Sequence, residues 1–233
     1  MTAPSEEIIR EVREEFGPRT LLSFSRGKDA VGAYLAIRDH FEEVIPYHLF
    51  LVPGLSFVEE SLAYYERVFG VKIYNLPHPS LYGQLNSFLF QSPGSAAVIE
   101  AASLPDFDYT DIVRMVAKEA GVDRPMVASG VRAADSPMRR VALMKHGAIS
   151  RTRMQYYPIW DWNKDRLISE IERSGIGLPI DYELFGRSFD GLDLRFILPL
   201  KKKRPDDYRK VLEYFPLAEA EIFRFERFSN GVA

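Results

Sequence analysis

The sequence predicts an α/β fold, a mostly parallel five-stranded sheet with helices on both faces, plus a C-terminal helical part. The main observation is that short apolar runs of strand type alternate with helix-like segments in the first third of the chain. A β-α-β-α-β order implies parallel strands joined by right-handed crossovers. The expected elements of this block are, in chain order, 21–24, 30–41, 44–52, 57–69 and 71–75.

The second observation is that the last third of the chain has a helical pattern, with helices expected at 205–215 and 217–228. Ser5 is expected to cap an amphipathic helix at 5–16, and an apolar run at 125–130 predicts a further strand. The proline-punctuated stretch 77–108 is harder to interpret. Helices are also expected at 81–90, 98–102, 106–120 and 164–173. We expect an α/β domain over 1–190 and a helical extension packed on it over 191–233.

Composition excludes several kinds of chemistry. The 233 residues include no cysteine, so the chain has no disulfide, thiol nucleophile, Cys zinc site or iron–sulfur cluster held by Cys. The net charge of −3 argues against nucleic-acid binding by electrostatic attraction over the whole surface. The N-terminus lacks a signal-type apolar core, and no run approaches the ~20 apolar residues that span a bilayer. We therefore expect a cytoplasmic protein without membrane contact.

The segment 20–41 contains the strongest local signal. The apolar run Leu21–Phe24 precedes a polar turn with Gly27, and a helix-like segment follows. Unpaired N–H groups and the helix dipole favour an anion at such a helix start. Lys28 adds a mobile cation, and Asp29 can cap the helix or help to hold a hydrated metal ion. An ordinary strand-turn-helix connection is the alternative.

The turn reads SFSRGKDA over 23–30. It resembles the pyrophosphate-binding loop of the ATP pyrophosphatase (PP-loop) superfamily, whose phosphoadenosine phosphosulfate (PAPS) reductase-like branch usually reads SFSGGKDS. Arg26 replaces the first glycine and Ala30 replaces the last serine. Neither the three-glycine dinucleotide loop nor the Walker loop is present.

A second motif lies at 129–140, SGVRAADSPMRR. It resembles the family segment G-x-R-x-x-E-S-x-x-R, with Asp135 in place of Glu. The matching residues are Gly130, Arg132, Ser136 and Arg139. Glycine lets the backbone approach a ligand closely. The guanidinium groups of Arg132 and Arg139 can each donate two hydrogen bonds to phosphate oxygens, and Arg140 can add to them. The alternative is a surface arginine cluster that pairs with acids.

Further segments occur in the family's order, so the resemblance covers roughly 19–190. The segment 157–165 resembles P-[LI]-x-D-W-T-x-x-D/E, with Asn163 as the helix cap and structural roles expected for Trp160 and Trp162. The segment 178–186 resembles L-P-x-x-x-L-Y-x-x-G. Two sites match in part: 52–54 reads VPG where the family has D-T-G, and Glu60-Ser61 stands for E-T.

The resemblance implies an adenine-nucleotide-binding enzyme. Members of the superfamily split ATP between the α and β phosphates, form an adenylylated intermediate and release pyrophosphate, normally with Mg²⁺. Arg132 and Arg139 would neutralise phosphate charge, and Leu51 and Val52 would meet the adenine. Gly130 and Ser136 are also expected to bind the nucleotide. Lys28, Asp29, Arg132 and Arg139 are the expected catalytic residues. The loop residues expected to hold pyrophosphate are Ser23, Ser25, Arg26, Gly27, Lys28 and Asp29.

Two other classes of function stay open. Ala30 and Val52, where the family has Ser and Asp, favour a non-catalytic nucleotide-binding or partner-regulating module. The run 201–204, KKKR, could line a nucleic acid or another acidic partner, although such runs are usually solvated. The reductases of this family need a cysteine nucleophile, so we expect no sulfonucleotide reduction. The sequence does not identify the acceptor, and it leaves the oligomeric state open between a monomer and a homodimer.

Overall fold

The sheet of this protein has six strands in the order β3-β2-β1-β4-β6-β5. The computed structural model describes residues 2–230. Strands β1, β2, β4 and β6 run parallel, and β5 pairs antiparallel with β6. The α/β class with a mostly parallel sheet is confirmed, and the sheet has six strands rather than the expected five. The short hairpin β5–β6 at its edge has no counterpart in the sequence-based prediction.

The described residues form two compact units. The first contains the chain up to His48, Tyr64–Leu76 and Tyr109–Leu178. The second contains Leu49–Ala63, Pro77–Asp108 and the chain from Pro179 onward. The division at residue 190 stays a prediction about domains, because compact units of packing are not independent folding domains.

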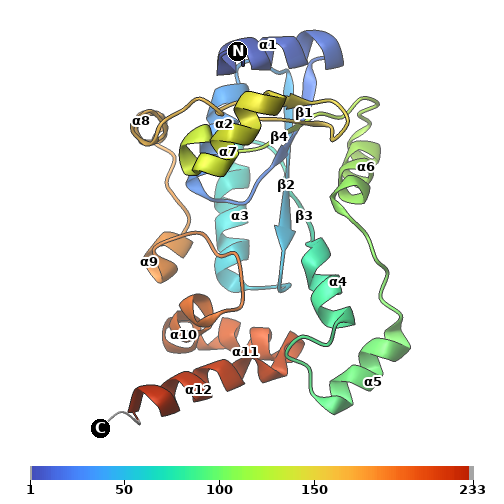
Figure 1. The fold of residues 1–233 in the computed structure, drawn as a ribbon, viewed down its shortest axis with the longest axis vertical. Helices are drawn as coiled ribbons and strands as arrows, with labels where there is room; N and C mark the ends of the chain where they lie inside the picture. The colour runs from blue at the N-terminus through green and yellow to red at the C-terminus, as the bar shows by residue number, and fades with distance from the viewer. Residues whose placement is uncertain (1, 231–233) are drawn as a thin grey trace. The chain divides into compact units, whose positions relative to one another are not determined.

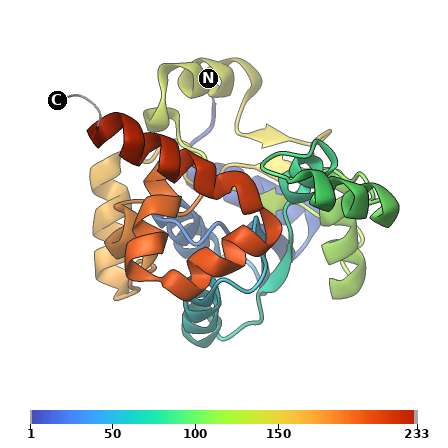
Figure 2. The ribbon, with the colours of Figure 1, turned by 90° about the horizontal axis from the view of Figure 1, so that it is seen from below.

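The first unit holds most of the sheet, and helices flank it on both faces. Helices α2 and α8 lie on one side of the strands and α6 lies on the other (Figures 1 and 2). The helices of this unit are α1 Ser5–Phe16, α2 Lys28–Ile37, α6 Tyr109–Ala120, α7 Pro137–His146 and α8 Lys164–Ser174, with a 3₁₀ turn at Ala133–Asp135. The strands are β1 Arg19–Ser23, β2 Glu43–Phe50, β3 Tyr74–Pro77, β4 Val127–Ala128, β5 Ile149–Ser150 and β6 Gln155–Tyr156. Strand β2 and helix α3, Ser56–Phe69, continue into the second unit.

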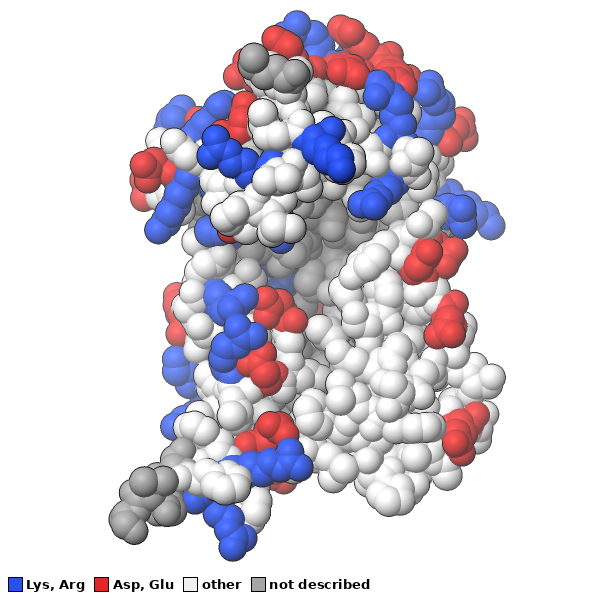
Figure 3. All heavy atoms as spheres, viewed as in Figure 1, with Lys and Arg blue, Asp and Glu red and all other residues white. Residues whose placement is uncertain are grey.

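Central strands and close helix packing build the core of the first unit. Leu21 and Leu22 of β1 and Val127 of β4 are fully buried, as expected for strands covered on both faces. Helix α2 approaches α8 at Gly32, where an added Cβ would collide with the side chain of Leu167. Around α7, Lys and Arg side chains lie on the surface (Figure 3).

Helix boundaries differ from the expected ones where polar residues begin a helix. Helix α2 begins at Lys28 rather than Ala30 and ends at Ile37 rather than Phe41. Ser5 does not cap α1, because the N-cap residue is Pro4, and the Ser5 hydroxyl donates instead to the carboxylate of Asp161. The expected cap of α8 is confirmed, since the side chain of Asn163 accepts from the Arg166 amide at 2.8 Å.

The second unit is mainly helical. Its helices are α4 Pro79–Asn86, α5 Pro93–Ala102, α9 Asp181–Phe185, α10 Leu194–Lys203, α11 Pro205–Tyr214 and α12 Glu219–Asn230. Asp207, which is buried, accepts from the Ser56 amide at 2.6 Å and from its hydroxyl at 2.7 Å, and so caps the start of α3. No helix among the described residues is long and apolar enough to cross a membrane.

The basic run at 201–204 makes contacts inside this unit. Arg204 donates to both carboxylate oxygens of Glu60, at 2.9 and 3.1 Å. Lys203 donates to the Glu183 carbonyl at 3.1 Å, and Lys201 lies 3.9 Å from Glu219. Three of these four cations therefore have intramolecular partners, which weakens the case for a nucleic-acid contact here.

Helix α4 should lose its cap as the pH falls. The Nδ1 of His78 accepts from the Ser80 amide at 3.0 Å, and burial lowers the pKa of His78. The unfolded chain then binds the proton more readily, so the stability from this cap is fully present above the unfolded pKa of about 6.5. It is lost as the pH falls through that value toward the lower folded pKa.

We therefore expect hydrogen exchange at Ser80, corrected for its intrinsic rate, to accelerate between about pH 7.5 and about pH 5.5. The variant His78→Asn offers an acceptor that does not titrate and should remove this dependence. The same pH profile in both proteins would contradict the assignment.

Candidate functional site

Two loops meet at the carboxyl edge of the sheet. Strands β1 and β4 are parallel neighbours, with Leu21 opposite Val127 and Leu22 opposite Ala128. The chain leaving β1 forms the loop 24–27, and the chain leaving β4 runs through Gly130 to Arg132. Parallel neighbours end at the same edge, so the two sequence motifs lie side by side, as expected.

Gly130 joins the two motifs by close packing. A Cβ added there would lie 2.5 Å from both the carbonyl carbon and the oxygen of Asp29, and 3.0 Å from the Ala30 nitrogen. These atoms are backbone at the start of α2 and cannot swing aside. A side chain at position 130 would therefore separate the β4 loop from the helix start.

Arg26 takes up a backbone conformation that favours glycine. Its φ is +64°, in the left-handed region, and the residue is only 1% exposed. The hydroxyl of Tyr65 donates to the Arg26 carbonyl at 3.4 Å. The position where the resembled loop has its first glycine thus keeps a glycine-like backbone, although its side chain is a buried arginine.

Lys28 and Asp29 form the first turn of α2 and pair with each other. The Nζ of Lys28 donates to Asp29 Oδ2 at 2.6 Å, and the two side chains are 28% and 33% exposed. The N-cap residue is Gly27, and no side chain caps the helix. The expectation that Asp29 can cap α2 is therefore wrong, since the N-cap residue is a glycine without a side-chain acceptor.

Arg132 is the most deeply buried cation of the second motif. Its Nε donates to Asp29 Oδ1 at 2.9 Å, and its Nη2 donates to Asp135 Oδ1 at 2.7 Å. The side chain is 5% exposed. Its remaining nitrogen, Nη1, is buried and has no hydrogen-bond partner among residues 2–230. Such a buried donor is costly unless a ligand or water completes it.

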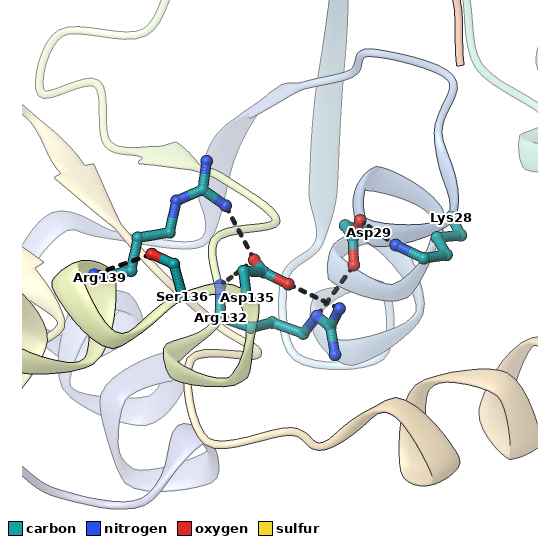
Figure 4. Close-up of polar contacts among 6 residues, drawn as sticks. All are labelled: Lys28, Asp29, Arg132, Asp135, Ser136 and Arg139. Carbon is teal, nitrogen blue, oxygen red and sulfur yellow. Dashed lines mark hydrogen bonds and ion pairs between the residues drawn. The ribbon is translucent and has the colours of Figure 1, made fainter. Parts of the chain in front are cut away.

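Asp135 connects Arg132 to Arg139. Its Oδ2 accepts from Nη1 of Arg139 at 2.9 Å and from the Arg132 amide at 3.1 Å (Figure 4). Ser136 caps α7 by accepting from the Arg139 amide at 3.1 Å. Lys28, Asp29, Arg132, Asp135 and Arg139 thus form one chain of ion pairs, in which three cations face two carboxylates.

The other predicted residues lie in different settings. Ser23 interacts with the hydroxyl of Tyr47, whose pKa is raised by burial. Ser25 is exposed in the loop. Leu51 and Val52 follow directly on β2 and belong to the second unit. The pairing of Lys28 with Asp29 and the bridging role of Asp135 were not expected from the sequence.

The residues of this site do not by themselves form a metal centre. No group of three His, Cys, Asp or Glu side chains in the described part of the chain is placed to hold a metal ion. Asp29, expected to meet Mg²⁺ through water, directs its two oxygens at Lys28 and Arg132.

No protein-family model matches the sequence, and no curated protein matches it significantly. Three solved structures show a distant similarity. PAPS reductase from Candida auris is 12% identical, covering 81% of this chain and 88% of its own, with a TM-score of 0.47. The U34-tRNA thiolase NcsA from Methanococcus maripaludis is 16% identical, covering 92% and 78%, with a TM-score of 0.47. The NH3-dependent NAD synthetase from Campylobacter jejuni is 12% identical, covering 96% and 92%, with a TM-score of 0.46.

Proposed function

We propose that this protein binds ATP or a related adenine nucleotide at the carboxyl edge of β1 and β4, and transfers its adenylyl group to an acceptor. The observation that carries the proposal is the buried Nη1 of Arg132, which has no hydrogen-bond partner in the described part of the chain. Arg132 contacts Asp29 in the first turn of α2, a helix whose N-cap residue is a glycine. A phosphate oxygen would satisfy this donor and the first-turn N–H groups together. An ordinary strand-turn-helix connection would not need a buried arginine there.

The motif sequence supports the identity of the ligand. The loop 23–30 resembles the pyrophosphate-binding loop of the PP-loop superfamily. Arg26, its main departure, has a left-handed backbone conformation, which glycine adopts readily. The second motif lies against the first through Gly130, and this close packing supports a single site built from both halves of the resembled pattern.

Binding would exchange partners within the ion-pair chain. Lys28 and Arg132 now share the carboxylate of Asp29. A polyphosphate carries more negative charge than one carboxylate, so both cations would turn to it. Asp135 would keep Arg132 and Arg139 oriented, because its oxygens hold one nitrogen of each. The carboxylates thereby position the cations before the ligand arrives.

In the proposed reaction, a nucleophilic atom of the acceptor attacks the α-phosphorus and forms a new bond to it. The bond between that phosphorus and the oxygen bridging to the β-phosphate breaks. Pyrophosphate leaves with the electron pair, and the acceptor gives up its proton, if it carries one, to solvent. Lys28, Arg132 and Arg139 would stabilise the negative charge that grows on the leaving pyrophosphate.

Pyrophosphate release tests this proposal. The protein is incubated with ATP, with Mg²⁺ and with candidate acceptors, and pyrophosphate is measured by a coupled assay. We expect acceptor-dependent release that is lost in Lys28→Ala and kept in Lys72→Ala, a variant of an exposed lysine outside the loop. Release at the same rate in both variants would contradict the proposed role of the loop.

A non-catalytic nucleotide-binding module is the second candidate. The observation in its favour is that Ala30 and Val52, which stand where the resembled family has Ser and Asp, are both buried. Neither of these apolar side chains offers a polar group to a reacting nucleotide. ATP binding without pyrophosphate release, across acceptors of several chemical classes, would favour this candidate.

We also expect no reduction of PAPS or adenylyl sulfate to sulfite. The resembled reductases need a thiolate that attacks sulfur, and this chain has no cysteine. The measurement is a sulfite assay with PAPS and reduced thioredoxin, with Lys28→Ala as the control. Catalytic sulfite formation above that control would refute the expectation.

A further inference from the structure

A second pocket adjoins the ion-pair chain in the first unit. Its volume is about 660 Å³, and it lies between α7 and the β5–β6 hairpin. Residues from both sides line it, among them Arg139, Leu143, His146, Ser150, Thr152 and Arg153. Pockets of roughly 300–1,000 Å³ are typical of small-molecule sites. Its size therefore suits a small organic ligand.

The lining is basic. It contains three arginines and one histidine and no Asp or Glu. Arg151 is held by Glu11 at 2.7 Å and by Glu15 at 2.5 Å. The side chains of Arg153 and His146, in contrast, make no hydrogen bond or ion pair with any residue from 2 to 230. The positive charge of Arg153 is thus left for a ligand, and the hydroxyl groups of Ser150 and Thr152 offer further hydrogen bonds.

The pocket shares two positions with the nucleotide site. Arg139 lines it and also pairs with Asp135. Val131, another lining residue, stands between Gly130 and Arg132 in the second motif. Along α7, His146 lies seven residues beyond Arg139, a rise of about 10 Å. A ligand in the pocket could therefore reach the phosphates with one end and Arg153 with the other.

We infer that this pocket binds the acceptor of the proposed reaction, and that the acceptor is a small molecule with a carboxylate or phosphate group. The role of the ligand as acceptor rests on the proposed function. The anionic group of the ligand is inferred from the pocket alone. The anionic group lies at Arg153 and His146, and the nucleophilic end lies near Arg139. A nucleic acid is disfavoured as the acceptor, because the chain carries a net charge of −3 and would not attract a polyanion over its whole surface.

The test is an NMR titration of the ¹⁵N-labelled protein with inorganic phosphate and, separately, with succinate. Amide signals of Gly147 and Thr152 report on the pocket, and those of Gly27 and Ala30 report on the loop. We expect one probe to shift Gly147 and Thr152 saturably, and its affinity to fall at least tenfold in Arg153→Ala. Arg67→Ala, a variant of an exposed arginine outside the pocket, should bind as the parent does.

The outcomes of this titration distinguish a failure of the anion-binding pocket from a failure of the proposed adenylyl transfer. No saturable shift at Gly147 and Thr152 with either probe, or unchanged affinity in Arg153→Ala, would overturn the inference. A short RNA that shifts these amides at lower concentration than both probes would overturn the small acceptor. Shifts in the pocket without any at Gly27 and Ala30, together with no ATP binding, would leave an anion pocket but overturn the proposed function and the acceptor role. The more effective probe identifies the anionic group.

Discussion

Replacing Gly130 with alanine should both destabilise the protein and abolish nucleotide binding. The new Cβ would lie 2.5 Å from the carbonyl atoms of Asp29, well inside van der Waals contact. Overpacking of a tight interior costs about 1–3 kcal/mol, and here the opposing atoms are backbone. Relief requires the β4 loop to move away from the start of α2, which would displace Arg132 from Asp29.

Denaturant unfolding and ATP calorimetry on the variant measure both effects. Gly83→Ala is the matched control, because an added Cβ at this α4 position meets nothing within 4 Å. Alanine inside a helix should stabilise that variant by up to about 1 kcal/mol. A Gly130→Ala protein with the parent's midpoint and ATP affinity would show that the two motifs do not need their close contact.

Replacing Arg132 with alanine should have the second largest effect. The change removes a buried cation and leaves Asp29 and Asp135 without their shared partner. Breaking a buried ion pair costs about 3–5 kcal/mol, and the cost here should be near or below the lower end because Asp29 is a third exposed. Loss of a charged hydrogen bond to phosphate should weaken ATP binding by about 1.5–3 kcal/mol.

Arg139→Ala provides the comparison. Arg139 is 54% exposed and makes one ion pair, so its loss should cost little stability and about 1 kcal/mol of binding. Urea unfolding and calorimetry on both variants give the two numbers. Equal losses for Arg132→Ala and Arg139→Ala, or no loss of ATP affinity in either, would show that burial does not set the importance of these arginines.

Much of the fold follows from local pattern. The helix at 5–16 matches α1 because its apolar stripe repeats at the helical period. The run 44–52 overlaps most of β2, Glu43–Phe50, because a continuous apolar segment of this length is typical of a buried strand. Strands β5 and β6, in contrast, have two residues each, too few for any periodic signal. Helix α7 was missed because Met138, Val141 and Met144 are exposed, so its apolar residues do not mark a buried face.

The candidate site likewise contains residues that local sequence predicts and contacts that it does not. Lys28, Arg132 and Gly130 could be chosen from residue types and spacing within each motif. The partnership of Arg132 with Asp29 could not, because the two residues are 103 positions apart and meet only when β1 and β4 pair. The expected turn at 25–29 ended two residues late, because Lys28 and Asp29 resemble turn residues in sequence yet begin α2. The helix dipole favours Asp29 in that first turn.

We propose that the loops after β1 and β4 form one phosphate site. Isothermal titration calorimetry with ATP and with adenosine, on the parent, Lys28→Ala and Lys72→Ala, measures whether they do. The structure predicts that ATP binds to the parent and to Lys72→Ala, that adenosine binds far more weakly, and that Lys28→Ala keeps its fold but loses measurable ATP binding. No heat of ATP binding to the parent, or the same ATP affinity in Lys28→Ala, would contradict the claim.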